Sequence, residues 1–497
     1  MDALKTIKLY RRRVVVKKPE CHSAIAVMLI FLSFLSFWVI FVNCLAEQSY
    51  SLLFVLPIVY GLCCLVFMDI FRYVPSNLGI TLILVLFFVR TIISPVLLCI
   101  GDYGVTVDLN IGDNTAGAIL LVAFETIAVF WTMKFAVNRK ERKTRIETKY
   151  QVPQIRKSYV IFLLVLIGIL FICYRTVPQL LTSYRTIFNL KDQYFVNFED
   201  AQVVDKYGTT FTTKLALVTG QYLVRILTIL IPAFAIVALA RHNNIFTKIV
   251  GALCCLFPLM FIGGAIARSL IYIVVLLLLY NYMFFKGGMN KKTVILLVTA
   301  GVLVVIYWIF FSNKGVFDFK ALSKKFSAYF SGVNVVSGVF NLPTDYEFRL
   351  RYFIYDYTST FPYGNTIFGI NHETVQPFFN KYNESYGQIP PTIAMSYYYF
   401  GPLFAPIYSM AFAYISVRCG KKVGMNKFGN PFRVLRHLLM IFAFAMGIVM
   451  YNIEITMTNF FSMYLPLLIL EKICYKGDQY VYTKGHTLLL VWRKQNS

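Results

Sequence analysis

The chain has 497 residues, of which 58% are apolar and only 14% are charged. Soluble globular proteins carry about 25% charged residues, so this composition excludes an ordinary water-soluble fold and predicts an all-α polytopic membrane protein. The net charge of +25 would indicate a nucleic-acid partner in a soluble protein. Here the basic residues gather in a few loops, which predicts orientation in the membrane, contact with membrane lipids and no nucleic-acid binding.

Twelve apolar runs follow one another along the chain, most of them close to the ~20 residues that a helix needs to cross a membrane. The first run is longer than the apolar core of a signal peptide, and a second run follows closely, so we expect it to be retained. The predicted spans are residues 23–45, 51–70, 79–100, 116–137, 159–174, 214–240, 247–266, 269–285, 293–313, 394–417, 438–456 and 457–471.

These spans divide the chain into seven segments, and basic residues gather in the loops that this topology places in the cytoplasm. Those loops hold 32 of the 48 Lys and Arg residues, so the positive-inside rule places both termini in the cytoplasm. The segments are a cytoplasmic tail (1–22), five spans (23–174), an extracytoplasmic loop (175–213), four spans (214–313), a large extracytoplasmic loop (314–393), three spans (394–471) and a cytoplasmic tail (472–497).

The sequence predicts no cofactor and no metal. Neither long outer loop contains any of the ten cysteines. The chain also lacks a phosphate-binding GxxxxGK[ST] loop and an HExxH zinc motif.

Two arginines lie in the middle of predicted spans, Arg90 in LFFVRTIISP and Arg225 in GQYLVRILTI, and Arg268 lies at the outer turn between two spans, in FIGGAIARSL. An arginine near the centre of a bilayer costs on the order of 3 kcal/mol, so each needs compensation. Glu125 lies at a matching depth and could form an ion pair with either Arg90 or Arg225. Because one carboxylate cannot neutralise two guanidinium groups, we expect at least one arginine to bind an anionic ligand. The guanidinium fork suits phosphate oxygens best.

The large outer loop begins with apolar residues at helical spacing, from Phe319 to Val333. This pattern predicts either an amphipathic helix on the outer membrane surface or a helix packed beneath the loop. Arg349 and Arg351 follow in YEFRLRYFIYDY. They would share one face of a strand but point about 200° apart on a helix. Acidic neighbours, Asp356 among them, leave surface ion pairing as the alternative to phosphate binding.

The rest of the loop is rich in aromatic residues, and we predict Tyr352, Tyr355 and Tyr363 to bind sugar rings, with apolar packing as the alternative. His372 is the first candidate for a general base and the adjacent Glu373 is the second. The alternative for this pair is an exposed loop dipeptide without a catalytic role.

The twelve-span layout, the turn GGAIARSL and the segment PPTIAMSYYYFGPLFAPIY together resemble the O-antigen polymerases, the Wzy-type oligosaccharide repeat unit polymerases. The resemblance covers nearly the whole chain. It implies a GT-C-like glycosyltransferase of the bacterial plasma (inner) membrane that joins undecaprenyl-diphosphate-linked oligosaccharides into O-antigen, capsular or exopolysaccharide on the outer face. It also implies that Arg268 and the outer-loop arginines bind the diphosphate, and that a chain-length regulator and a flippase are candidate partners.

We expect such a site to use direct displacement, since no carboxylate pair for a covalent intermediate is evident. Direct displacement inverts the configuration at the anomeric carbon and releases undecaprenyl diphosphate. One alternative is an O-antigen ligase, which uses the same donor with a different acceptor. Another is a flippase for lipid-linked oligosaccharides, which is expected to have repeated halves and short loops.

Overall fold

Helices make up most of the chain that the computed structural model describes, together with two small sheets. The described residues are 20–43, 50–74, 76–102, 114–139, 151–155, 157–177, 211–241, 245–246, 249–250, 254, 274, 278, 318–330, 332–361, 373–385, 387–424, 431–473, 475–479, 481–482 and 488–489.

Five helical stretches of the described chain are long and apolar enough to cross a membrane, so this is a helical membrane protein. Four of them agree within a few residues with predicted spans. The spans predicted at 247–266, 269–285 and 293–313 lie almost entirely outside the described residues. The five stretches are Ala24–Asn43, Leu78–Ile100, Thr115–Asn138, Tyr159–Thr176 and Phe432–Val449.

Among the first helices, α2 packs against both α1 and α5. α2 is only 12 residues long, shorter than the predicted span at 51–70. α3, η4 and α4 form one continuous helix in which η4 is a π-helical turn. The bounds are α1 (Glu20–Asn43), α2 (Val55–Val66), the 3-10 helix η3 (Met68–Tyr73), α3 (Leu78–Phe88), η4 (Val89–Ile93), α4 (Ser94–Ile100) and α5 (Thr115–Asn138).

The single span predicted at 394–417 is wrong, because the structure divides it into α18 (Thr392–Phe400) and α19 (Ile407–Gly424). Gly401 has a φ of +76°, which is outside the helical region. Pro402 and Pro406 follow within the turn that joins the helices. These three residues end one helix and start the next.

The boundary predicted between spans at 456 and 457 is also wrong. Helix α20 (Pro431–Val449) ends earlier, and α21 (Ile453–Asn459), the π-helical turn η7 (Phe460–Tyr464) and α22 (Leu465–Ile473) follow it. The side chain of Asn452 accepts a hydrogen bond of 2.7 Å from the Ile455 amide and so caps α21.

The start of α20 differs from the prediction too, because Arg433, Arg436 and His437 belong to the helix and not to the loop predicted at 418–437. The long side chain of Arg436 stacks over the Tyr464 ring at 5.0 Å, and such packing lets a basic residue occupy a helix.

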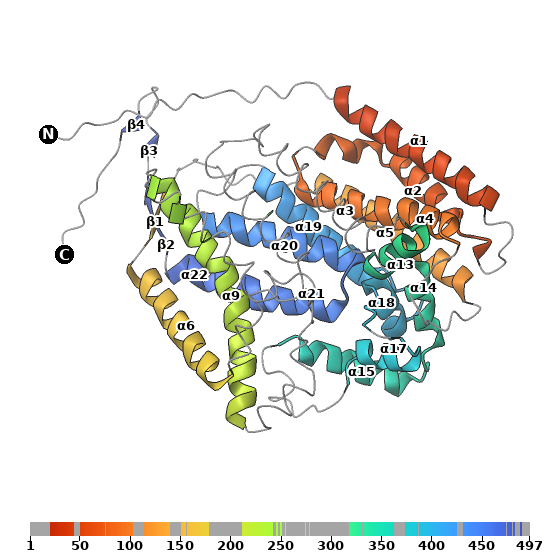
Figure 1. Cartoon of the computed structure of the whole chain (residues 1–497). Coiled ribbons are helices and arrows are strands. Elements are labelled where there is room, and N and C mark those ends of the chain that lie inside the picture. Colours follow the sequence, from red (N-terminus) through yellow and green to blue (C-terminus); the bar gives the residue numbers. More distant parts are fainter. Residues whose placement is uncertain are drawn as a thin grey trace.

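A pair of helices, α6 (Lys157–Thr176) and α9 (Phe211–Arg241), packs together along one side of the molecule (Figure 1). The Tyr159 hydroxyl donates to the Leu230 carbonyl at 3.0 Å. Strand β1 (Gln151–Ile155), directly before α6, pairs antiparallel with β2 (Tyr475–Gln479), directly after α22. A second sheet joins β3 (Val481–Tyr482) to β4 (Leu488–Leu489).

Short helices from the large outer loop pack on the bundle: α13 on α4 and α14 on α5. Leu322, Ser323 and Ser327 of α13 are buried. This supports the packed helix over the surface helix. η6 and α15 contact α18, α15 also contacts α21, and α17 contacts α15. The bounds are α13 (Phe319–Tyr329), α14 (Val333–Ser337), the 3-10 helix η6 (Gly338–Asn341), α15 (Tyr346–Ser359) and α17 (Val375–Tyr382).

The two ends of the bundle differ. Figure 1 shows α13, α14, α17 and α18 gathered at one end, with β1 and β2 toward the other. At the latter end Lys421 donates to the Val137 carbonyl at 2.8 Å and Arg418 to the Arg139 carbonyl at 3.3 Å. These cations complement the negative end of the α5 dipole.

Close packing of α3 on α19 depends on glycines. The Asn77 side chain caps α3 through the amides of Gly79 (3.1 Å) and Ile80 (3.3 Å) and also donates to the Val417 carbonyl at 3.0 Å. A Cβ at Gly420 would overlap with the Asn77 side-chain oxygen and lie 2.9 Å from the Gly79 amide nitrogen.

We therefore expect Gly420→Ala to destabilise the fold by about 1–3 kcal/mol, the usual cost of overpacking, and to lower the unfolding temperature in detergent. The matched control is Gly168→Ala in α6, where no atom lies within 4 Å of the added Cβ. Equal unfolding temperatures for the two variants would contradict this packing.

Candidate functional site

Arg90 forms an ion pair in the interior of the bundle. Its Nη1 atom lies 2.6 Å from Oε2 of Glu125, and the two side chains are 1% and 0% exposed. The Ser409 hydroxyl donates to the other carboxylate oxygen. The pair thus joins η4, α5 and α19.

The ion-pair interpretation therefore replaces the prediction that Arg90 binds diphosphate. The physical reason is that a desolvated guanidinium is best compensated by a carboxylate at the same depth, and Glu125 supplies one. Arg225 lies on α9, but its side chain is not among the described ones, and Arg268 lies outside the described residues.

Most of the other predicted site residues come together on the loop helices. We call this group the loop site: Arg349, Arg351, Tyr352, Tyr355 and Asp356 on α15, with Glu373 two residues before α17 and Tyr399 on α18. His372 and Tyr363 lie outside the described residues.

The two loop arginines occupy a helix, so they do not share a face. Arg349 is half-buried, and its Nε atom has no hydrogen-bond partner within the part of the chain that is described. Arg351 is exposed, and its guanidinium lies over the rings of Phe348 (5.4 Å) and Tyr355 (5.9 Å). Arg351 is therefore the more accessible of the two cations.

Tyr352 is 7% exposed, which is too little for an open platform that stacks on a sugar. Its ring stacks on Phe378 with centroids 4.6 Å apart. Burial raises the pKa of Tyr352, and the Glu373 carboxylate adds to this effect while Arg351 opposes it. For Tyr352, aromatic packing describes the structure better than the predicted sugar contact. Tyr355 is half-buried beside Arg351.

Asp356 is the central residue of the loop site. It is fully buried, accepts a hydrogen bond of 2.9 Å from the Val375 amide and accepts another from the Tyr399 hydroxyl. Val375 is the first residue of α17, so the carboxyl group of Asp356 holds the start of α17, and with it Glu373, against α15 and α18. Glu373 itself is exposed.

The burial of Asp356 and the nearby Glu454 carboxylate raise its pKa to about 8. Glu454 in α21 accepts a hydrogen bond of 2.9 Å from Ser359 at the end of α15. α17 is also tied to this region, because Asn452 donates to the Gln376 side chain at 3.1 Å. The loop site therefore rests on the turn between α20 and α21.

Sequence reasoning placed Asp356 only among charges that flank the arginines. The signal that could have identified it is the spacing of Arg349, Tyr352 and Asp356, because positions i, i+3 and i+7 lie on one face of a helix.

Comparisons with known proteins give no match: no family model, no curated protein and no solved structure is similar to this chain.

We expect Arg90→Met or Glu125→Leu alone to cost about 3–5 kcal/mol, because each leaves a buried charge without its partner. The double variant should regain a large part of that loss, which thermal unfolding of all four proteins measures. Additive losses would contradict the ion pair.

The raised pKa of Asp356 predicts a pH dependence of stability. The folded protein binds a proton here between the ordinary value of 3.8 and about 8, so this residue's contribution to stability is greatest at low pH and falls as the pH rises through that window. Asp356→Asn should reduce the loss of unfolding temperature between pH 5 and pH 8. The exposed Asp345→Asn is the control, and an unchanged pH profile for Asp356→Asn would contradict the assignment.

Proposed function

We propose that this protein is a lipid-diphosphate-dependent glycosyltransferase that polymerises undecaprenyl-diphosphate-linked oligosaccharides on the outer face of the bacterial plasma membrane. The proposal includes about twelve spans in a GT-C-like arrangement and cytoplasmic termini.

The observation that carries the proposal is the loop site, in which two arginines and an exposed carboxylate share the same small group of helices. A glycan leaving a lipid diphosphate develops negative charge on the phosphate oxygens, and fixed guanidinium groups stabilise that charge. The acceptor hydroxyl is a weak nucleophile and needs a positioned base. Arg349, Arg351 and Glu373 supply both kinds of group.

In the proposed reaction the acceptor oxygen attacks the anomeric carbon of the lipid-linked glycan. A bond forms between that oxygen and that carbon, while the bond from the carbon to the phosphate oxygen breaks. The hydroxyl proton passes to Glu373 or to the adjacent His372. The electron pair leaves with undecaprenyl diphosphate, and the sugar configuration inverts.

Asp356 takes a positioning role in this proposal. It is fully buried, so it does not reach a substrate. Through the Val375 amide it fixes the segment that carries Glu373. Arg225 and Arg268 remain candidates for diphosphate binding, and Tyr355 and Tyr363 for sugar binding.

The charge distribution supports the proposed orientation. Lys421 and Arg418 lie at the end of the bundle opposite the loop helices, on the carbonyls that end α5. The positive-inside rule assigns such an end to the cytoplasm. The loop site then faces outward, where lipid-linked oligosaccharides are polymerised.

We expect purified protein supplied with synthetic undecaprenyl-diphosphate repeat units to form a ladder of lengthened glycans. Glu373→Gln should slow this reaction by about 10²–10⁴-fold if it is the base, and Arg351→Ala by about 10²-fold. Arg268→Ala should abolish the ladder while preserving expression.

The control is Lys381→Ala, which removes an exposed cation of α17 outside the loop site. Normal rates for both loop-site variants would remove them from the mechanism. A product that forms only on a lipid A core acceptor would indicate a ligase.

A further inference from the structure

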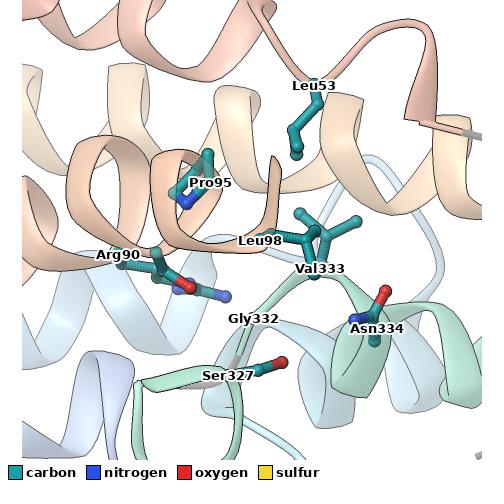
Figure 2. Close-up of a pocket in the computed structure, with 9 residues that line it drawn as sticks. Leu53, Arg90, Pro95, Leu98, Ser327, Gly332, Val333 and Asn334 are labelled. Carbon is teal, nitrogen blue, oxygen red and sulfur yellow. The ribbon is translucent and has the colours of Figure 1, made fainter. Parts of the chain in front are cut away.

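A small cavity of about 10 Å³ lies between the membrane-spanning stretch Leu78–Ile100 and the loop helices (Figure 2). This volume is close to that needed by one water molecule. Its polar lining consists of Arg90 from η4, Ser94 from α4, Ser327 from α13 and Asn334 from α14. Figure 2 shows Arg90, Ser327 and Asn334 approaching this space from three different elements.

Two lining side chains have buried polar atoms without a protein partner. Ser327 is 3% exposed and Asn334 is 1% exposed. Within the described chain, neither Oγ of Ser327 nor Nδ2 of Asn334 has a hydrogen-bond partner. The orientation of the Asn334 amide is fixed, because its oxygen accepts a hydrogen bond of 2.7 Å from Tyr50.

Hydrogen-bond donors dominate this lining. The guanidinium and the amide NH₂ only donate, and a serine hydroxyl can do either. Among the described residues that line the cavity there is no carboxylate. Glu125, the ion-pair partner of Arg90, is not one of these lining residues. An occupant that suits the cavity is therefore small and accepts hydrogen bonds.

We infer that this cavity is a binding site for one small hydrogen-bond acceptor, either a water oxygen or a chloride ion. The bound atom bridges Ser327 of α13 and Asn334 of α14 beside Arg90. It thereby fastens two loop helices to the membrane helix that carries the buried ion pair. The inference is independent of glycosyl transfer.

The test is a structure of the full chain in lipid nanodiscs at a resolution that resolves ordered waters. The expected result is a density peak within hydrogen-bond distance of both Ser327 Oγ and Asn334 Nδ2. Crystals grown in bromide distinguish chloride from water, because bromide replaces chloride at a halide site and gives an anomalous peak, whereas water does not. No density at this position, or new protein partners for both side chains, would overturn the inference.

Two variants of Asn334 test the site, so the result does not depend on a single variant folding correctly. Asn334→Leu should remove the density and lower the unfolding temperature. Asn334→Asp keeps the oxygen that bonds Tyr50 but places a carboxylate in the cavity, so it should expel chloride and retain water. The control is Ser337→Ala, a buried serine of the same helix that does not line the cavity. Density that persists unchanged in Asn334→Leu would also overturn the inference.

Discussion

The buried charge of Arg90 constrains how η4, α5 and α19 pack together. A guanidinium in the interior of a membrane bundle requires a partner, and Glu125 provides it at 2.6 Å. Ser409 completes the group by bonding the second carboxylate oxygen. Three helices distant in sequence are thereby held in one register. The π-helical turn that contains Arg90 is the local distortion that accompanies this arrangement, and such turns are rare inside α-helices.

The loop site depends on a second buried acid in the same way. Asp356 binds the start of α17 and the Tyr399 hydroxyl, so one carboxyl group connects α15, α17 and α18. Glu454 extends the network to α21 through Ser359. The groups that could contact a substrate, Arg351 and Glu373, remain exposed around this buried centre. A rigid interior with accessible polar groups at its edge is the arrangement expected of a site that must position reactants.

The spacing of apolar residues and the depth of charged residues in the predicted membrane spans were sufficient to predict several features from the sequence. Helical spacing predicted the helix that begins at Phe319. Matched depth gave Glu125 as the alternative partner of Arg90 or Arg225, and the structure pairs it with Arg90. The break between α20 and α21 was not predictable in this way, because Asn452 lies within an otherwise apolar run and acts through a local cap. Asp356 was missed because its partners, Val375 and Tyr399, are distant in sequence and only the fold brings them together.

We propose that the arginines of the loop site bind the phosphate groups of a carrier lipid. A cryo-electron microscopy structure in nanodiscs containing undecaprenyl diphosphate tests it most directly. We predict phosphate density within hydrogen-bond distance of Arg349 or Arg351. Phosphate density confined to the opposite end of the bundle, beside Arg418 and Lys421, would contradict it.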